Sequence, residues 1–185
     1  SILVLKFGGT SVGSVDLIKS AAQIIKKEYE SGYDIAVVVS AMSGTTNKLI
    51  ENINLINSQD DAEYDAILAS GEQVTSGLLA LALKEININA RSWLGWQLPI
   101  VTSGNHRHSL ISKIENKNIL DGFLNRQVAV VAGFQGVGSN GRITTIGRGG
   151  SDNTAVFLAS ALNAERCDIY TDVDGVYTTD PRMAD

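Results

Sequence analysis

Short apolar runs alternate along the chain with longer stretches in which apolar residues recur at helical spacing. The segments at 2–7, 35–39, 128–132 and 168–172 predict strands, and the nearly continuous hydrophobicity of the first three is typical of strands buried on both faces of a parallel sheet. The amphipathic stretches between them predict helices. Strands that alternate with helices in this way indicate an α/β fold, a three-layer αβα sandwich with a mainly parallel open sheet.

The first predicted helix, 15–31, has the clearest signal. An apolar stripe runs along it, and Gly32 follows at the position of a helix C-cap. The other helices are expected at 46–56, at 60–86 as two helices broken near Ser70-Gly71, at 109–125, and at 151–163 with a serine or aspartate side chain as its cap.

Length and composition fit one globular domain. The chain has 185 residues, of which 44% are hydrophobic and 19% are charged, and its formal net charge is −5. This negative charge, without any Lys/Arg run, gives no electrostatic support to a nucleic-acid surface. No apolar run approaches the roughly 20 residues of a membrane span, and no signal peptide precedes the first strand. We therefore expect a cytoplasmic protein with neither a nucleic-acid nor a membrane partner.

Several reactive or bulky side chains have simple structural interpretations. Cys167 is the one cysteine, which fits a reducing compartment, and we expect a core residue because nothing nearby would activate a thiolate. His106 and His108 lie in a polar loop without a clear third ligand, so they do not predict a metal site. Trp93 and Trp96 are interpreted as packing residues.

Two glycine-rich segments carry the main chemical signal. Residues 4–13 and 145–155 each run from an apolar strand through glycines into a helical stretch. This layout sets backbone N–H groups and a helix N-terminus against phosphate oxygens. The first segment carries Lys6, and the second carries Arg148 and Asp152. Together they predict a site that moves a phosphoryl group.

Two apparent nucleotide motifs fail on their context. Residues 136–141 match G-x-G-x-x-G, but 142–146 reads as a strand, so a hairpin turn is predicted instead of a pyrophosphate site. Residues 8–13 have P-loop glycine spacing, but Ser14 stands where a Walker A motif needs lysine.

Lys6 is the sharper signal because it lies inside an apolar strand, where an unpaired charge is costly. It could reach solvent from the end of the strand. We favour an ammonium group that projects from the carboxyl end of the strand, where open α/β sheets bind ligands. Gly8 and Gly9 follow directly and would let backbone N–H groups approach an anion.

Four other polar features have simple structural interpretations, and three of them also have a functional one. Arg148 is either an exposed turn residue or a bidentate clamp on a carboxylate or phosphate. Asp152 is either an N-cap or a group that orients a lysine or holds Mg²⁺. Glu72 would by itself indicate only a helix N-terminus. The segment 171–177 is either a tight turn or a nucleotide-base pocket roofed by Tyr177.

Taken together, these segments resemble aspartokinases, members of the amino-acid kinase superfamily. The resemblance spans essentially the whole chain and is most specific in its last two motifs. It is carried by Lys6-Phe7-Gly8-Gly9-Thr10-Ser11, Ser40-Ala41-Met42, Ser70-Gly71-Glu72, Gly133-Phe134-Gln135-Gly136, Ile146-Gly147-Arg148-Gly149-Gly150-Ser151-Asp152 and the segment 170–182.

The resemblance implies the amino-acid kinase fold, a homo-oligomer, and ATP- and Mg²⁺-dependent phosphorylation of the L-aspartate β-carboxylate, which opens lysine, threonine, methionine and diaminopimelate synthesis. By motif position, Lys6 and Asp152 would be catalytic, with Gly8 and Gly9 donating backbone N–H groups. The aspartate site would comprise Thr46, Glu72, Phe134, Arg148 and Ser151. The ATP site would comprise Lys6, Gly9, Thr171, Asp172, Tyr177 and Arg182.

The family's kinase domain continues beyond the position matched by Asp185, and regulatory ACT domains follow it. We therefore expect residues 1–185 to be a catalytic domain truncated at its C-terminal end. Two alternatives stay open: a sister kinase for another carboxylate, and a non-catalytic nucleotide-binding lobe or subunit of the same fold.

Overall fold

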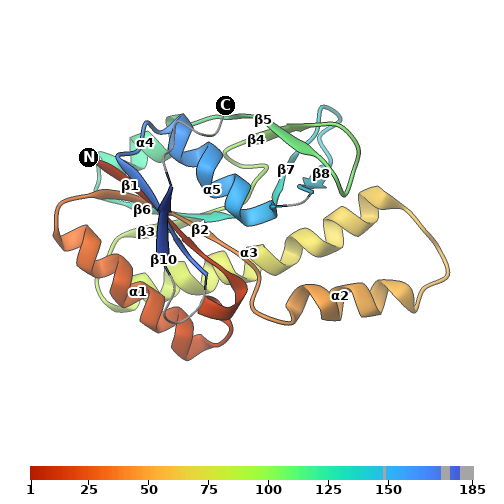
Figure 1. The fold of residues 1–185 in the computed structure, drawn as a ribbon, viewed down its shortest axis with the longest axis horizontal. Helices are drawn as coiled ribbons and strands as arrows, with labels where there is room; N and C mark the ends of the chain where they lie inside the picture. Colours follow the sequence, from red (N-terminus) through yellow and green to blue (C-terminus); the bar gives the residue numbers. More distant parts are fainter. Residues whose placement is uncertain (148, 172–175, 180–185) are drawn as a thin grey trace.

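A six-stranded, mainly parallel sheet forms the centre of the molecule in this computed structural model, which describes residues 1–147, 149–171 and 176–179 (Figure 1). The strand order is β10-β9-β1-β2-β6-β3, and only β10 runs antiparallel to its neighbour among the described strands of this sheet. The strands are β1 (Ile2–Phe7), β2 (Asp34–Val39), β3 (Ala90–Trp93), β6 (Val128–Ala132), β9 (Arg166–Tyr170) and β10 (Val176–Thr179).

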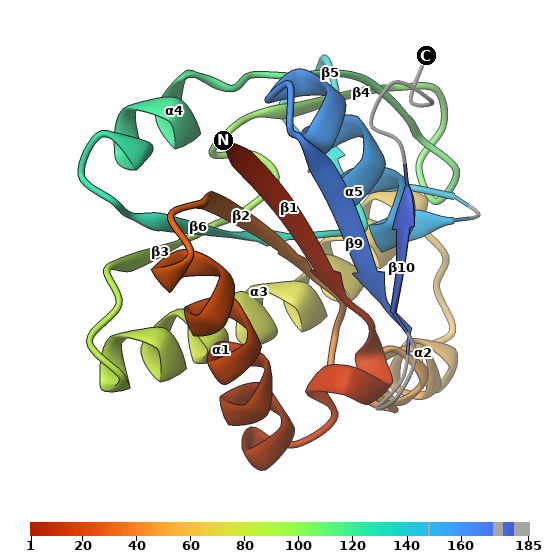
Figure 2. The ribbon, with the colours of Figure 1, turned by 60° about the vertical axis from the view of Figure 1, so that its left-hand side comes forward.

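Helices cover both faces of this sheet (Figure 2). One face packs against α1 (Val15–Glu30) and α3 (Asp61–Glu85), and the other against α4 (Lys117–Phe123) and α5 (Gly150–Ala161). Each face has its own hydrophobic core, so the central strands are buried on both sides, as their continuous apolar runs predicted. The predicted three-layer α/β sandwich is confirmed.

The alternation of side chains along β1 decides where its lysine points. Leu3, Leu5 and Phe7 belong to the core beneath α1 and α3, whereas Val4 belongs to the core beneath α4 and α5. Because side chains alternate between the two faces of a strand, Lys6 shares a face with Val4. The lysine therefore points toward the layer that contains α5.

A smaller sheet lies beside the first and was only partly predicted. Its order is β5-β4-β7-β8, with strands β4 (Ile100–Ser103), β5 (Leu110–Ile114), β7 (Gln135–Val137) and β8 (Ile143–Thr145). The antiparallel hairpin of β7 and β8 confirms the turn predicted at 136–141. The helix predicted over 109–125 is wrong in its first half, because that half pairs with β4 as strand β5 and only Lys117–Phe123 is helical.

Some predicted helix ends and packing residues also differ from the structure. Gly149, with φ of 88°, precedes α5, and no side chain caps this end among the described residues, so the predicted serine or aspartate cap is wrong. Ser14 caps α1 and Asp60 caps α3 through bonds to backbone N–H groups. Trp93 is buried as predicted, but Trp96 is half exposed, which contradicts its assignment as a packing residue.

The long helix α3 is continuous, so the predicted break near Ser70-Gly71 is wrong. It forms a hairpin with α2 (Thr45–Asn54), and the pair extends beneath the smaller sheet (Figure 1). A Cβ placed on Gly71 would lie 2.9 Å from the Cβ of Ala41. Gly71 is therefore a site of close approach to the loop after β2, and the glycine does not interrupt the helix.

Replacing Gly71 by alanine is expected to destabilise the protein. The new methyl group overlaps Ala41, an overpacking cost of about 1–3 kcal/mol, which outweighs the helix-propensity gain of about 1 kcal/mol. Gly77 provides a matched control in the same helix, because nothing lies within 4 Å of a Cβ at that position. Chemical unfolding should show Gly71→Ala less stable and Gly77→Ala more stable than wild type; equal gains would contradict the close contact.

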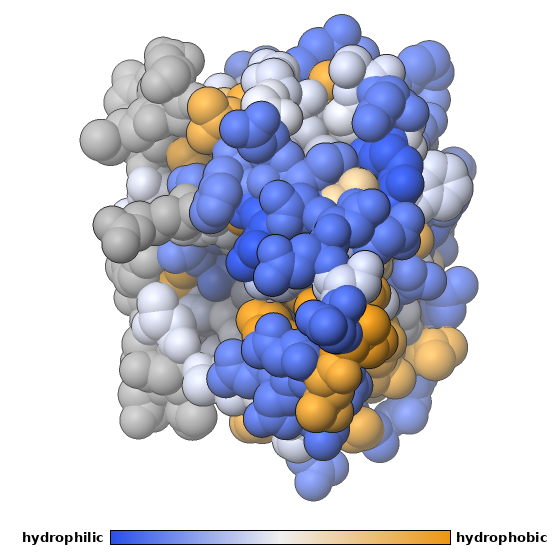
Figure 3. Space-filling model, turned by 90° about the vertical axis from the view of Figure 1, so that its right-hand side faces the viewer, coloured by the Kyte–Doolittle hydropathy of each residue, from blue (hydrophilic) through white to orange (hydrophobic). Residues whose placement is uncertain are grey.

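Apolar side chains also reach the surface, at the end of the molecule formed by α2 and the start of α3 (Figure 3). Leu55 and Ile56 are 85% and 67% exposed there. By length and composition, α3 is the one helix in the described part of the chain that could cross a membrane, but 50% of its most apolar window is buried inside the fold. Partial burial of this kind is common in core helices of globular proteins.

Candidate active site

An ion pair between a buried lysine and a partly exposed aspartate joins the two glycine-rich segments. The Nζ atom of Lys6, near the end of β1, lies 2.7 Å from Oδ1 of Asp152 in the first turn of α5. Lys6 is 8% exposed, so the carboxylate offsets much of the cost of burying its charge. Both groups lie at the carboxyl ends of parallel strands, beside a helix N-terminus. The predicted meeting of these segments is confirmed.

Gly8 and Gly9, which follow Phe7 after Lys6, have different structural roles. Gly8 donates its N–H to the carbonyl of Tyr170 over 3.1 Å, which contradicts the expectation that this N–H is directed at a phosphate. A Cβ on Gly8 would lie 3.4 Å from Nζ of Lys6, so the glycine leaves room for the ammonium group. Gly9 opens a 3₁₀ helix, η1 (Gly9–Val12), where the first N–H groups have no acceptor within the helix.

The loop after β1 also contacts the loop after β9. The Thr10 hydroxyl donates to the Thr171 carbonyl over 3.0 Å, and the rings of Phe7 and Tyr170 stack with centroids 4.7 Å apart. Thr171 therefore borders the Lys6 loop, as its assignment to the nucleotide site requires. Sequence reasoning did not identify Thr10 as the link between these loops.

Glu72 reaches the same edge of the sheet from α3. Its Oε1 accepts the N–H of Ala41 over 3.1 Å, while Oε2 has no hydrogen-bond partner in the described part of the chain. The residue is 4% exposed, and this burial raises its pKa from 4.5 to about 7. A buried carboxylate oxygen without a partner is costly, and a cationic ligand group would compensate that cost.

Gly133 and Phe134, which follow β6, contact the first turns of α5. The Phe134 N–H donates to the hydroxyl of Thr154, and its ring covers Gly150, where an added Cβ would lie 3.0 Å from a ring carbon. Phe134 has a φ of 72°, a conformation uncommon for residues other than glycine and one often found at functional sites. A Cβ on Gly133 would lie 3.0 Å from Oγ of Ser151, so strand end and helix start are in close contact.

The remaining predicted positions are placed less fully. Thr46 is half-buried in the first turn of α2, beside Thr45, whose methyl group faces Gly71. Tyr177 belongs to β10 and its backbone pairs with Ile169, but its side chain lies outside the described part. Arg148, Asp172 and Arg182 lie outside the described residues.

One polar cluster at this end of the molecule was not predicted. Asp65 in α3 is fully buried and accepts hydrogen bonds from the 103–109 loop and from β8. The sequence signal was an aspartate two positions before an apolar stretch of a helix, which is too common to single out.

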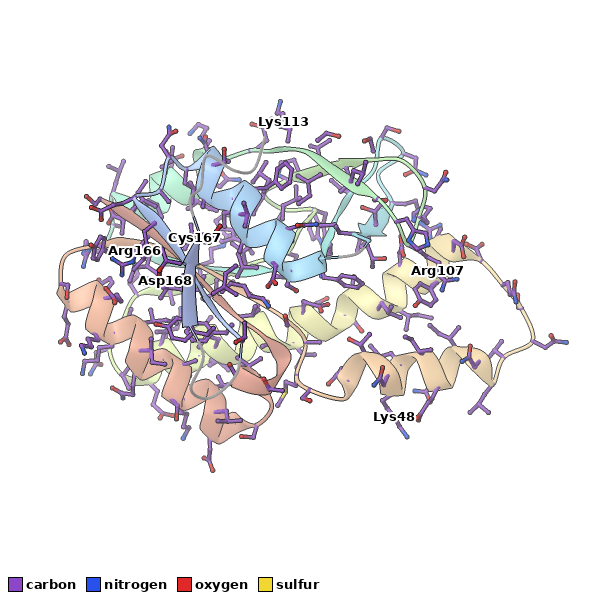
Figure 4. All side chains as sticks on the ribbon, viewed as in Figure 1. Lys48, Arg107, Lys113, Arg166, Cys167 and Asp168 are labelled. Carbon is purple, nitrogen blue, oxygen red and sulfur yellow. The ribbon has the colours of Figure 1, made fainter. Side chains whose placement is uncertain are left out.

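Cys167 lies in β9, buried as predicted (Figure 4), and burial raises its pKa to about 12.

Comparison with known proteins finds relatives over the whole length of the chain. The Amino acid kinase family model matches residues 1–185. The chain is 49% identical over 188 residues to the aspartokinase of Rickettsia bellii and 52% identical over 184 residues to that of Pseudomonas aeruginosa. These matches cover 99% of the chain but 46% and 45% of the relatives, so the chain spans about half their length.

Solved structures show the same fold. E. coli aspartokinase III in complex with aspartate and ADP has a TM-score of 0.82 and 29% identity, covering 98% of this chain and 52% of that one. Aspartate kinase from Synechocystis has a TM-score of 0.77 and 43% identity, covering 99% of this chain and 30% of that one. With Lys6 and Asp152 paired between two glycine loops, and with the family model matched from end to end, the chain belongs to the amino acid kinase family.

Proposed function

We propose that this chain is the catalytic region of an aspartate kinase, which transfers the γ-phosphoryl group of ATP to the β-carboxylate of L-aspartate. The observation that carries the proposal is the pair of buried Lys6 with Asp152 at the N-terminus of α5. In the proposed reaction, this positive charge and the helix dipole would stabilise a transferring phosphoryl group. The aspartokinases that are about half identical to the chain support the same reaction.

In the proposed reaction, the side chains of the protein form no covalent bond with the substrates. An ionised β-carboxylate oxygen attacks the γ-phosphorus, the bond to the β,γ-bridging oxygen breaks, and ADP leaves with that electron pair. No general base is needed because the nucleophile is already deprotonated. Catalysis then rests on positioning and on neutralising charge, which is the task of Lys6, oriented by Asp152.

Selection of aspartate would depend on groups around α5 and α3. Glu72 presents its unpartnered Oε2 for the substrate ammonium group. We assign Arg148 to the substrate carboxylates and Thr46, Phe134 and Ser151 to the walls of the site. For ATP, we assign Gly9, Thr171, Asp172, Tyr177 and Arg182 together with Lys6.

Magnesium would enter with the nucleotide. Mg²⁺ is usually held by one or two carboxylates together with substrate phosphates, not by a complete protein cage. Asp152 is the described carboxylate beside Lys6 that could share in its coordination.

We also propose where the protein acts, its oligomeric state and the pathway that it serves. A cytoplasmic homo-oligomer that makes 4-phospho-L-aspartate would supply the first intermediate of lysine, threonine, methionine and diaminopimelate synthesis.

The first test is ATP- and Mg²⁺-dependent formation of a hydroxamate, with L-aspartate and L-glutamate compared in the protein at its full natural length. A strong signal with aspartate alone would establish both the acyl-phosphate chemistry and the substrate. A signal with glutamate alone would indicate a sister kinase. ATP binding without turnover of either acid would favour a non-catalytic lobe.

Replacing Arg148 by alanine is expected to raise the KM for aspartate by about 10- to 100-fold, since one charge-assisted carboxylate contact contributes about 1.5–3 kcal/mol. Turnover at saturating aspartate should fall much less. Arg91→Ala is the matched control, because this arginine stacks on Trp93 in β3 at the far edge of the sheet. An unchanged KM in Arg148→Ala would remove this residue from the aspartate site.

A further inference from the structure

The polar cluster around Asp65 lies next to the glycine loop that precedes α5. Asp65 is 0% exposed, and its carboxylate accepts from both donors of Thr145: the hydroxyl over 2.7 Å at Oδ1 and the N–H over 3.0 Å at Oδ2. Oδ2 also accepts the N–H of Arg107 over 3.1 Å and lies 2.6 Å from Nδ1 of His106, which we take as a donor because a carboxylate offers acceptors. A buried carboxylate with several donors ties together the segments that supply them.

These donors belong to two segments that are distant in the sequence. His106 and Arg107 lie in the loop between β4 and β5, and Thr145 is the last residue of β8. Figure 4 shows Arg107 where this loop reaches α3. The Arg107 backbone has a φ of 71°, a strained conformation for a non-glycine residue, and the bond to Asp65 helps to hold it. Asp65 thus fixes both segments against one helix.

The Thr145 segment continues directly into the glycine loop, and the 105–109 segment contacts that loop. Ser109 donates its N–H to the Thr145 carbonyl over 3.1 Å, and Gly147 donates to the Ser109 carbonyl over 3.4 Å. A Cβ on Gly147 would lie 3.4 Å from Cα of His108, so the 105–109 segment and the glycine loop are in van der Waals contact. The loop then leads through Gly149 to Ser151 and Asp152, which holds Lys6.

We propose that Asp65 is a positioning residue for phosphoryl transfer. Through Thr145 and the 105–109 segment, it holds the glycine loop and the first turn of α5, so that Asp152 and Ser151 keep their places. Asp65 itself touches neither substrate nor Lys6 in this role. The kinetic part of the inference rests on the proposed function, whereas the structural part does not.

Asp65→Asn is the test variant, because it keeps the shape of the side chain but replaces one acceptor oxygen with an amide nitrogen that repels the donors around it. Two measurements on the full-length protein are combined: hydrogen exchange of the amides of residues 145–153, and kcat and KM with aspartate. We expect exchange to rise and kcat/KM to fall, each by about 10- to 100-fold, because small displacements of positioned groups reduce rates on that scale.

Two further variants separate positioning from stability. Ile25→Ala opens a cavity in α1, away from the glycine loop, and controls for a general loss of stability. Thr145→Val removes one bond to Asp65 with little change of shape, and it replaces Asp65→Asn if that variant does not fold. All measurements are made at a temperature where every variant is folded.

The inference predicts that Asp65→Asn and Thr145→Val raise exchange in 145–153 and lower kcat/KM, while Ile25→Ala changes neither. If Asp65→Asn and Thr145→Val both leave exchange and kcat/KM unchanged, as Ile25→Ala does, the inference is overturned. Asp65 would then be a purely structural residue. If wild-type protein phosphorylates no aspartate, the proposed function fails, and exchange alone still decides whether Asp65 holds the glycine loop.

Discussion

Lys6→Ala is expected to reduce kcat for aspartate phosphorylation by about 100- to 1000-fold, the usual effect of removing one preorganised group that stabilises charge in a transition state. The KM for aspartate should change little, because Lys6 is assigned to the transferring phosphoryl group and not to the amino acid. The measurement is steady-state hydroxamate formation, with aspartate affinity determined separately by calorimetry.

The variant should still fold, which keeps the kinetic result interpretable. Removing Lys6 leaves the enclosed Oδ1 of Asp152 without its partner, but the Asp152 side chain as a whole is 44% exposed, and the space left by the lysine side chain admits water to this oxygen. Lys19→Ala is the matched control, because Lys19 makes an exposed ion pair with Glu85 on the surface. Normal turnover by a folded Lys6→Ala protein would exclude Lys6 from catalysis.

The central sheet was predictable because burial on both faces leaves a direct trace in the sequence. The runs at β1, β2 and β6 are nearly all apolar, and the helices between them show periodic stripes. The smaller sheet left no such trace. Its strand β5 has exposed and half-buried residues ahead of Ile114, so pairing with β4 decided its structure against a helical pattern.

Part of the candidate site was predictable for a related reason. A lysine inside an apolar strand followed by glycines is unusual enough to indicate a role, and the structure pairs it with Asp152. The partners of a buried polar group are harder to find, because they depend on contacts between distant segments. Asp65 contacts His106 and Thr145, and no local pattern links these three positions.

The glycine-rich segments show that motif spacing alone does not predict the role of each glycine. Spacing indicated that Gly8 and Gly9 approach an anion, but only the tertiary structure shows that Gly8 gives its N–H to Tyr170 and makes room for Lys6. Similarly, Gly71 was predicted to break the helix. The structure needs glycine there because the helix lies close to Ala41, and this contact leaves no signal in the sequence.

Glu72 should make both stability and aspartate binding depend on pH near neutrality. Burial raises its pKa from the ordinary value of 4.5 to about 7, so the folded state binds the proton more tightly than the unfolded state does. Between these values the folded state carries more protons than the unfolded state, and stability falls as pH rises. The full loss, reached above pH 7, is about 3 kcal/mol, since one pKa unit corresponds to about 1.4 kcal/mol.

Glu72→Gln should remove this loss. Urea unfolding from pH 4.5 to 8 is expected to show wild type losing stability relative to the variant as pH rises, with the difference levelling off above pH 7. Glu51→Gln is the matched control because Glu51 is exposed on α2 and pairs only weakly with Lys48. Parallel stability curves for Glu72→Gln and wild type would show that burial does not perturb this carboxylate.

Binding should respond to pH in the opposite direction. Only ionised Glu72 can pair with the substrate ammonium group, so kcat/KM for aspartate in wild type should fall about tenfold per pH unit below pH 7. Glu72→Gln should lower kcat/KM at pH 8 by about 10- to 100-fold, the cost of losing a charge-assisted contact, and should show a flat profile where wild type declines. The same carboxylate would then cost stability without aspartate and strengthen binding with it. A steep profile that persists in Glu72→Gln would assign the titration to another group.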